Sequence, residues 1–394
     1  MLGLSPMSAP PETLLVFSCG IGQGALDETQ NGQNSIFTEK LLKHIATPDE
    51  DIESLLMKVT RDVRDATGGY QIPYRQTCLT EKIFLTKNLS PVPLRASSTA
   101  ISPNAKWTQN GITVAGGNEW GSETNKLHEP YGLYVDDDQT IYVADEWNHR
   151  IVEWKSGATN GKVVAGGNGS RQLYNPLDVI VDKESDSLII SDCGHNRVVR
   201  WPRRNGTRGE TIISNIACFG LTMDDNGSLY VVDYEKHEVR RYKIGDTKGT
   251  LVAGGNGQGS RLDQLSGPSY VFVDRDHSVY VSDLGNDRVM KWEEGAKQGI
   301  VVADGQEEGN SLSQLNCPQG VVVDQLGTVY VTDSWNHRIM RWPKGATQGS
   351  VIVGGLLNQL QYPVGLSFDR HGNLYVVDYG NHRVQKFNIV SNSI

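Results

Sequence analysis

The sequence predicts a mainly β protein, a six-bladed β-propeller preceded by a small N-terminal α/β fragment. An apolar run of β-forming residues that closes on an aspartate recurs six times, and a turn-forming segment follows each copy. The six aspartates are Asp145, Asp192, Asp233, Asp283, Asp333 and Asp378. Successive aspartates are 47, 41, 50, 50 and 45 residues apart. A period of about 40–50 residues with several short strands is typical of propeller blades.

The first copy shows how a repeat forms a four-stranded blade. Ile141–Asp145 is a continuous apolar run, as expected of a strand buried on both faces. Asp and Asn side chains after it favour a hairpin turn. A second strand then ends in an aromatic residue, an outer strand ends near Gly166-Gly167, and a short strand after a proline completes the unit. The strand-ending aromatics are Trp154, Trp201, Tyr242, Trp292, Trp342 and Phe387.

Three of the turns carry the triplet Asn-His-Arg, at residues 148–150, 336–338 and 381–383. With these triplets, residues 107–390 resemble the NHL-repeat family, and the resemblance implies a six-bladed propeller. The third copy departs most, since His237 stands there without the Asn and the Arg. The stretch 111–117 copies the outer-strand pattern before the first full repeat, and the last repeat has no outer strand of its own. We therefore expect Ile112–Ala115 to complete the last blade and to close the ring.

The N-terminal part predicts a small α/β fragment. Residues 1–12 are expected to be disordered, and Thr13–Phe17 to form a parallel strand buried on both faces, with Cys19 just after its end. A helical apolar stripe follows around residues 36–45. A second helix is expected to begin at an N-cap Thr47 and to end at Gly68-Gly69. Its apolar face is Ile52, Leu55, Leu56, Val59 and Val63.

The order of these elements resembles the caspase-like cysteine peptidases (peptidase C14) over residues 13–86. The matching stretches are 14–20, 22–27, 34–37, 41–45, 51–53, 63–64 and 67–73. The resemblance implies that Cys19 is the nucleophile and that its backbone N–H is an oxyanion donor. The family's general base is a His followed by Gly, well upstream of the Cys, whereas the 18 residues before Cys19 contain no His. His44 is expected on a solvated helix face rather than as a substitute base.

A thiol needs an adjacent base to become an effective nucleophile. We therefore expect the later half of a caspase-like domain, inactive as this chain alone unless the His-containing half is supplied. The upstream coding sequence would show whether Met1 is the true start. Residues 87–106 mix Pro and Ser without periodicity and are expected to form a linker to the propeller, residues 107–394.

The net charge is −9, which argues against general nucleic-acid binding because that is driven by phosphate neutralisation. Five scattered cysteines form neither a zinc spacing nor a disulfide framework, and no secretory signal is visible, so a cytoplasmic location is expected. The histidines repeat at blade period, so they would be spread around a ring and are expected to hold turns rather than a metal. No cofactor is expected.

Six residues are candidates for binding. Trp120, Trp147, Trp335 and Tyr379 fall in turn positions, where exposed aromatics would suit protein recognition, although packing within the turns explains them equally well. Arg203 and Arg204 lie in a basic run that could contact phosphate or an acidic peptide, although a solvated loop is the favoured interpretation.

The expected function is a protein- or peptide-binding propeller fused to an incomplete caspase-like endopeptidase and linked to proteolysis. A dimer or a complementing caspase-like chain could complete the peptidase. One alternative is a non-catalytic adaptor or substrate receptor of a ubiquitin-ligase pathway, although no RING-type Cys/His cluster is present. The other alternative is an RNA-binding propeller, which the net charge disfavours.

Overall fold

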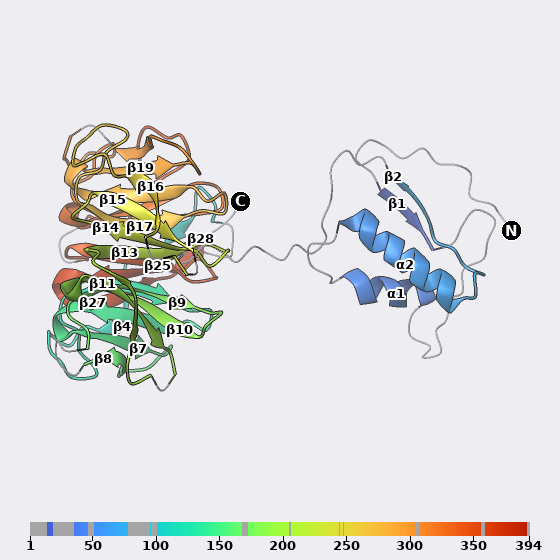
Figure 1. Ribbon diagram of the computed structural model, residues 1–394, viewed down its shortest axis with the longest axis horizontal. Coiled ribbons are helices and arrows are strands. Elements are labelled where there is room, and N and C mark those ends of the chain that lie inside the picture. Colours follow the sequence, from blue (N-terminus) through green and yellow to red (C-terminus); the bar gives the residue numbers. More distant parts are fainter. Residues whose placement is uncertain are drawn as a thin grey trace. The chain divides into compact units, whose positions relative to one another are not determined.

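The computed structural model describes residues 14–18, 35–45, 51–77, 95, 101–167, 172–204, 206–243, 245–246, 248–304, 307–355 and 359–391. The chain divides into two compact units, Met1–Pro91 and Val92–Ile394 (Figure 1). This boundary falls inside the predicted linker. The predicted disordered start, residues 1–12, lies outside the described residues. No helix among the described residues is both long and apolar enough to cross a bilayer.

The described residues of the first unit form two helices and a two-stranded sheet (Figure 1). The elements are β1 (Leu14–Phe17), α1 (Ile36–Ile45), α2 (Ile52–Ala66) and β2 (Tyr74–Thr77). The predicted apolar face of α2 is buried as expected, and Ile36, Phe37 and Leu41 of α1 pack against it. This confirms that the 3.6-residue periodicity of both helices set their contact.

Two details of the first unit differ from the prediction. The N-cap of α2 is Asp51, whose carboxylate accepts hydrogen bonds from the N–H groups of Glu53 and Ser54; Thr47 lies outside the described residues. The strand β1 pairs antiparallel with β2, and Val16 is exposed. The prediction of a parallel strand buried on both faces was therefore wrong for the described part of this unit, because a run of four apolar residues does not specify the direction of its partner.

The described residues of the second unit form six four-stranded antiparallel sheets, the six blades of a propeller. Blade 1 contains β5 (Pro130–Val135), β6 (Ile141–Asp145), β7 (Arg150–Trp154) and β8 (Lys162–Gly166). Blade 2 contains β9 (Pro176–Asp182), β10 (Ser187–Asp192), β11 (Arg197–Pro202) and β12 (Glu210–Ser214). Blade 3 contains β13 (Cys218–Met223), β14 (Leu229–Asp233), β15 (Glu238–Tyr242) and β16 (Thr250–Gly254).

Blade 4 contains β17 (Pro268–Val273), β18 (Val279–Asp283), β19 (Arg288–Trp292) and β20 (Ile300–Asp304). Blade 5 contains β21 (Pro318–Val323), β22 (Val329–Asp333), β23 (Arg338–Trp342) and β24 (Ser350–Gly354). Blade 6 contains β25 (Pro363–Phe368), β26 (Leu374–Asp378), β27 (Arg383–Phe387) and, from the start of the unit, β4 (Ile112–Gly116). One-turn 3₁₀ helices join the second and third strands of blades 1, 2, 4, 5 and 6: η1 (Glu146–Asn148), η2 (Cys193–His195), η3 (Leu284–Asn286), η4 (Ser334–Asn336) and η5 (Tyr379–Asn381).

The ring closes by strand exchange, as the sequence predicts. β4 pairs antiparallel with β27, with Ala115 opposite Val384. A second closing pair joins β28 (Ile389–Ser391) to β3 (Lys106–Trp107). Both pairs tie the two ends of the unit together, so the last blade has no missing edge strand.

The strand-ending aromatics are buried, and Trp154, Trp292, Trp342 and Phe387 are among the largest fully buried side chains. The inner strands of neighbouring blades contact one another around the axis. We call the end of the ring that bears the η turns the upper face. The lower face bears the hairpins between the first and second strands of each blade, such as residues 136–140.

The recurring Asp and Arg form ion pairs in blades 1, 2, 4, 5 and 6, and both side chains are buried in blades 1, 4 and 5. In blade 5, Arg338 Nε donates to Asp333 Oδ2 at 2.6 Å, and the other guanidinium nitrogens donate to the carbonyls of Asn310, Ser311 and Gln314. Asn336 Nδ2 donates to the same carboxylate. The pair therefore fixes both the hairpin turn and the loop that enters the blade, which confirms the predicted role of the aspartates.

The recurring histidines connect one blade to the next. His337 adopts a left-handed conformation (φ 54°), and its Nδ1 accepts a hydrogen bond from the N–H of Tyr362 in the loop before the next blade. His149, His237 and His382 accept equivalent bonds from Asn175, Gly267 and Glu129, and Asp287 accepts one from Cys317. Because these ring nitrogens accept hydrogen bonds from backbone N–H groups, the prediction that the histidines hold turns is confirmed.

Arg95, which the sequence placed in the linker, is buried among the inner strands. Its Nε donates to the carbonyl of Leu133 (3.0 Å) in blade 1, and Nη1 donates to the carbonyl of Leu221 (2.8 Å) in blade 3. Its Nη2 pairs with Asp178 of blade 2. The Arg95 carbonyl accepts from the N–H of Phe368 (2.7 Å) in blade 6. One residue outside the repeats thus contacts four blades at the axis, blades 1, 2 and 3 through its guanidinium and blade 6 through its carbonyl.

Candidate functional site

Exposed aromatic rings form a row on the upper face where blades 6 and 1 meet. His128 lies between Trp120 (ring centroids 5.0 Å apart, interplanar angle 33°) and Trp147 (5.6 Å, 31°). Trp120 is 63 % exposed and Trp147 54 % exposed. Such a stacked row offers a large, rigid apolar area with little loss of side-chain entropy on binding, as protein-recognition surfaces do.

The aromatic row continues towards the axis of the ring. Trp147 lies near the Tyr379 hydroxyl, and the ring of Tyr379 meets that of Tyr131 edge-on at 6.3 Å. Tyr131 also contacts Phe219 (6.2 Å), which stacks on Tyr234 (4.7 Å). Residues of blades 1, 3 and 6 thereby form one aromatic cluster on the upper face, although they are far apart in the sequence. We call this cluster the mouth.

Two glutamates lie within this mouth. The Tyr379 hydroxyl donates to Glu129 Oε2 at 2.7 Å, and Asn175 Nδ2 donates to Glu146 Oε1 at 3.2 Å. Burial, together with the nearby charge of Glu129, raises the pKa of Glu146 to about 7, against the hydrogen bond from Asn175. Among the described residues, no Lys or Arg forms an ion pair with either glutamate. The mouth therefore carries negative charge that no described side chain neutralises.

The local sequence explains how these groups are held. Glu146 and Trp147 lie on η1, whose flanking Asp145 bonds the N–H of His128 at 2.8 Å. Glu129 adopts a left-handed conformation (φ 48°) just before β5, and its N–H donates to His382 Nδ1 at 3.1 Å. The loop is thus fixed by both neighbouring turns. A rigid scaffold under an exposed loop is the usual way to build a binding site.

Taken together, aromatic faces and unpaired carboxylates suit a cation. An ammonium or guanidinium group over an aromatic ring is stabilised by the ring quadrupole, more strongly when it is partly desolvated. The described part of the chain holds no group of three or more His, Cys, Asp or Glu side chains arranged to bind a metal. The arrangement at the mouth provides binding groups and no nucleophile–base pair.

The structure brings some of the predicted binding residues together and separates others. Trp120, Trp147 and Tyr379 share the upper-face cluster described above. Trp335 lies on η4 of blade 5, also on the upper face and 63 % exposed, but with no ring contact to the cluster among the described residues.

The two predicted arginines lie on the lower face, in the connection between β11 and β12. Arg203 Nη2 pairs with Asp136 Oδ2 at 2.8 Å and its guanidinium lies 5.4 Å from the centre of the Tyr142 ring. Arg204 is exposed and its Nε lies 3.3 Å from Asp186. Arg203 therefore joins blade 2 to blade 1.

Cys19 lies outside the described residues, so its role stays a prediction. Next to it in sequence, the carbonyl of Ser18 accepts a hydrogen bond from the buried Gln71 Nε2 at 2.7 Å. His44 is not on a solvated face as predicted: its Nε2 lies 2.9 Å from Asp62 Oδ2, and its side chain is mostly buried. Hydrogen bonds from Lys43 and His44 lower the pKa of Asp62 to about 2. The helical stripe did not reveal this pair because Asp62 comes from the second helix.

His128, Tyr131, Phe219 and the two glutamates of the mouth were not predicted from the sequence. His128 and Glu129 lie in the loop before β5, and Tyr131 is the second residue of that strand. The corresponding loops of the other blades differ in length. Glu146 falls inside the repeat, but the same position holds Cys193, Leu284 and Ser334 in other blades. No periodic signal could have found this group.

Comparison with family models identifies both parts of the chain. The NHL repeat matches residues 127–154, 315–341 and 360–387, the three copies with the intact Asn-His-Arg triplet. The Caspase domain matches residues 5–84. The chain thus carries NHL repeats on a six-bladed propeller and a caspase-like segment before it. Comparison with curated proteins finds no match.

Several solved structures share the propeller fold at low sequence identity. A protein of unknown function from Bacteroides thetaiotaomicron has a TM-score of 0.58 at 17 % identity, covering 72 % of this chain and 76 % of that one. An auxiliary nutrient binding protein from the same organism has a TM-score of 0.56 at 14 % identity, covering 73 % and 78 %. A gluconolactonase from Xanthomonas campestris has a TM-score of 0.51 at 14 % identity, covering 75 % and 99 %. These likenesses concern the fold alone.

Proposed function

We propose that the upper face of the propeller binds a partner protein through a basic side chain, so that the chain joins a recognition unit to a caspase-like segment. The observation that carries this proposal is the mouth in which Trp147 and Tyr379 surround Glu129 and Glu146. Aromatic rings attract a cation by their faces, and the glutamates add charge complementarity in a partly desolvated place. A lysine or arginine side chain in an exposed partner segment would supply both contacts.

The same charges disfavour the RNA-binding alternative. RNA would bring phosphates to the mouth, and phosphate binding depends on lysine and arginine side chains that release counterions. The mouth instead contains two glutamates, and the whole chain has a net charge of −9. The adaptor alternative in a ubiquitin-ligase pathway is compatible with the proposed recognition, since it needs the same binding surface.

The proposal predicts binding of basic peptides. Fluorescent octapeptide pools with a fixed central Lys or Arg are expected to bind the full chain in an anisotropy titration, whereas pools with a central Glu or norleucine are not. Trp147→Ala is expected to weaken the binding of the basic pools about tenfold, the scale of an interface hot spot. Trp335→Ala is the matched control, since Trp335 is exposed on the same face outside the cluster.

The pH dependence provides a second readout of this binding. Because the pKa of Glu146 is raised to about 7, the carboxyl is half protonated near neutrality and must lose its proton to pair with a cation. The affinity for the basic pools should therefore rise as the pH increases from 6 to 8, and Glu146→Gln should remove this rise. The groups around Glu146 are Glu129, Tyr131, Tyr270, Tyr379 and Cys193. Equal binding of the Glu-centred pools, or equal losses in the Trp147 and Trp335 variants, would contradict the proposal.

We also propose that Cys19 is reactive only when the His-containing half of a caspase-like fold is supplied. The one histidine among residues 1–91 is His44, and Asp62 holds it. A peptide electrophile carrying a reporter is therefore expected to leave the isolated chain unlabelled and to label it after a caspase-like chain with the His-Gly segment is added. Cys19→Ala should abolish the labelling, while Cys317→Ala should not. Rapid labelling of the isolated chain at Cys19 would refute this.

A further inference from the structure

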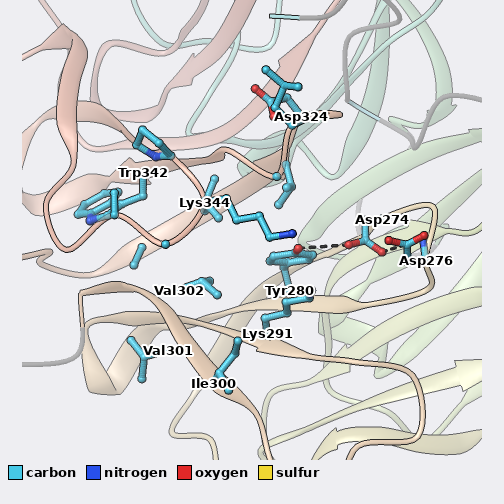
Figure 2. A pocket seen from close by; sticks show the side chains of 18 of the residues that line it. Asp274, Asp276, Tyr280, Lys291, Ile300, Val301, Val302, Asp324, Trp342 and Lys344 are labelled. Carbon is cyan, nitrogen blue, oxygen red and sulfur yellow. Dashed lines mark hydrogen bonds between the residues drawn. The ribbon is translucent and has the colours of Figure 1, made fainter. Parts of the chain in front are cut away.

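The lower face contains a groove between blades 4 and 5, with a volume of about 830 Å³. Figure 2 shows Ile300 and Val302 of β20 on one side, Trp342 at one end and Tyr280 beside Asp274 at the other. The volume lies in the range of pockets that enclose a ligand, about 300–1,000 Å³. The walls combine apolar and polar side chains, and Lys291 and Lys344 reach into the groove.

The equivalent groove between blades 5 and 6 shows what such a space can hold, because the chain fills it with its own residues 101–109. Trp107 is buried there between Tyr330 (ring centroids 6.1 Å apart) and Phe368 (6.0 Å). Its indole Nε1 donates to the carbonyl of Gly372 at 2.9 Å. Arg341 Nη1 donates to the carbonyl of Ala105 at 2.9 Å. The occupant thus turns at residues 102–105 and then runs extended through Lys106–Trp107, with Trp107 as its one large aromatic anchor.

The two grooves are built from the same positions of the repeat. Tyr280 pairs with Lys291 across β18 and β19 just as Tyr330 pairs with Arg341 across β22 and β23. The remaining matches are Val302 with Ile352, Val323 with Phe368, and Gly327 with Gly372. Ile352 is buried under residues 101–109, whereas Val302 is only half-buried. The groove between blades 4 and 5 therefore has the aromatic ring of Tyr280, the cationic donor Lys291 and the hairpin glycine Gly327, but no described segment of the chain fills it.

Three of the other grooves are bridged by side chains from two positions of the repeat, that of Arg203 and Glu294 and that of Arg241 and Lys386. Arg203 of blade 2 lies over Tyr142 and pairs with Asp136 of blade 1. Glu294 of blade 4 pairs with Arg241 of blade 3 at 3.1 Å. Lys386 of blade 6 lies over Tyr375 and bonds Gln139 of blade 1.

In the groove between blades 4 and 5 the residue at the position of Arg203 and Glu294 is Lys344. It forms no hydrogen bond or ion pair among the described residues. Its side chain points towards Tyr280 (Figure 2). Lys291, at the position of Arg241 and Lys386, lies over the Tyr280 ring at 5.6 Å and pairs with Glu293 of its own blade at 3.8 Å. Among the described residues, neither lysine therefore pairs across this groove, and Lys344, which holds no partner, can move aside for a ligand.

We propose that the groove between blades 4 and 5 binds an extended segment of a partner protein that inserts a tryptophan-like side chain between Tyr280 and Val323. Lys291 would donate to a backbone carbonyl of that segment, as Arg341 does to Ala105. Lys344 at the entrance of this groove favours a carboxylate in the segment, next to the tryptophan-like side chain. This binding surface is separate from the upper-face mouth and does not depend on it.

The best available probe is the segment that fills the equivalent groove. A fluorescein-labelled peptide with the sequence of residues 101–111 is titrated with the full chain, and saturable binding is expected by anisotropy. Trp107→Ala in the peptide should weaken binding about tenfold or more, as for a buried aromatic anchor. In the protein, Ile300→Glu should have a similar effect, and Ile300 is 55 % exposed, so the fold should tolerate the change.

Two further variants make the result decisive. Val302→Trp should also abolish binding, because the new side chain fills the groove. Leu251→Glu is the matched control on the outer strand of blade 3, where the residue is 42 % exposed, and it should bind like the unmodified chain, as should Trp147→Ala. Absence of saturable binding, or equal binding of the Trp107→Ala peptide, would overturn the proposal. Binding that survives Ile300→Glu would place the peptide elsewhere, by exchange into the groove between blades 5 and 6, and would overturn it as well.

Discussion

Replacing Arg338 with alanine is expected to lower the free energy of unfolding of the propeller by about 3–5 kcal/mol, the cost of removing one partner from a buried ion pair. Arg338 and Asp333 are both buried. The substitution leaves the carboxylate uncompensated, and it also leaves the carbonyls of Asn310, Ser311 and Gln314 without their donor. Urea unfolding followed by far-UV circular dichroism measures the difference.

Blade 2 provides the matched control for this prediction. Arg197 makes the same ion pair to Asp192 at 2.7 Å, but its side chain is 28 % exposed, so water can replace part of what is lost. Arg197→Ala should therefore cost clearly less than Arg338→Ala. Equal losses of unfolding free energy in the two variants would show that burial does not determine how much the ion pair stabilises the fold.

The free energy of unfolding that Arg338→Ala loses, its deficit, is expected to depend on pH. The direction of that dependence shows whether the charge of the Arg338–Asp333 pair contributes to stability. Burial raises the pKa of Asp333 even in the presence of Arg338, and removing the arginine raises it further. An acid whose pKa is higher in the folded state takes up a proton on folding, so its contribution to stability falls as the pH rises through that window. The deficit should be larger at pH 8 than at pH 5, and Asp333→Asn in the same chain should recover part of it.

The architecture could be predicted because each blade repeats a local pattern. The apolar runs and the strand-ending aromatics each indicate the same structure six times, the turn triplet does so in three copies, and the glycine-rich copy at residues 111–117 indicated how the ring closes. The structure confirms six blades and the exchange of β4. Repetition of this kind turns weak single-residue preferences into a firm prediction of fold.

Features that occur once could not be predicted in this way. Arg95 contacts inner strands that lie 38, 84 and 126 residues further along the chain, and nothing in its own Pro- and Ser-rich segment indicates burial. Glu129 and Glu146 meet only because two loops converge on the upper face. The direction of β1 depended on β2, which lies about 60 residues away. In each case the information is in the three-dimensional arrangement and not in a local period.

The second large effect is expected at Arg95. Arg95→Ala should lower the free energy of unfolding of the propeller by about 3–5 kcal/mol, because Asp178 is fully buried and Arg95 is its charged partner. The carbonyls of Leu133 and Leu221 would lose their donors as well. Arg95→Lys keeps the charge but has a single nitrogen in place of the guanidinium fork, so an intermediate loss is expected. Urea unfolding of the three proteins side by side measures this order.

The pH dependence again separates charge from packing. Burial raises the pKa of Asp178 to about 6 although Arg95 opposes the shift. Because this value is above the 3.8 of the unfolded chain, the folded state takes up a proton, and the contribution of Asp178 to stability falls as the pH rises from about 4 to about 6. Without Arg95 the folded pKa is higher still, so the window extends upwards and the Arg95→Ala deficit should grow between pH 5 and pH 8.

Two comparisons decide whether Arg95 acts as a part of the propeller. Asp178→Asn combined with Arg95→Ala should remove most of the pH dependence of the deficit, since the buried charge is gone. A propeller that begins at residue 107, where the repeats begin in the sequence, should lose at least as much stability as Arg95→Ala relative to one that begins at Val92, because it also lacks Ile101 and Ala105 of the core. If the shorter propeller were as stable as the longer one, the segment before the repeats would be a linker, as its composition alone suggests, and the guanidinium at the axis would have no structural role.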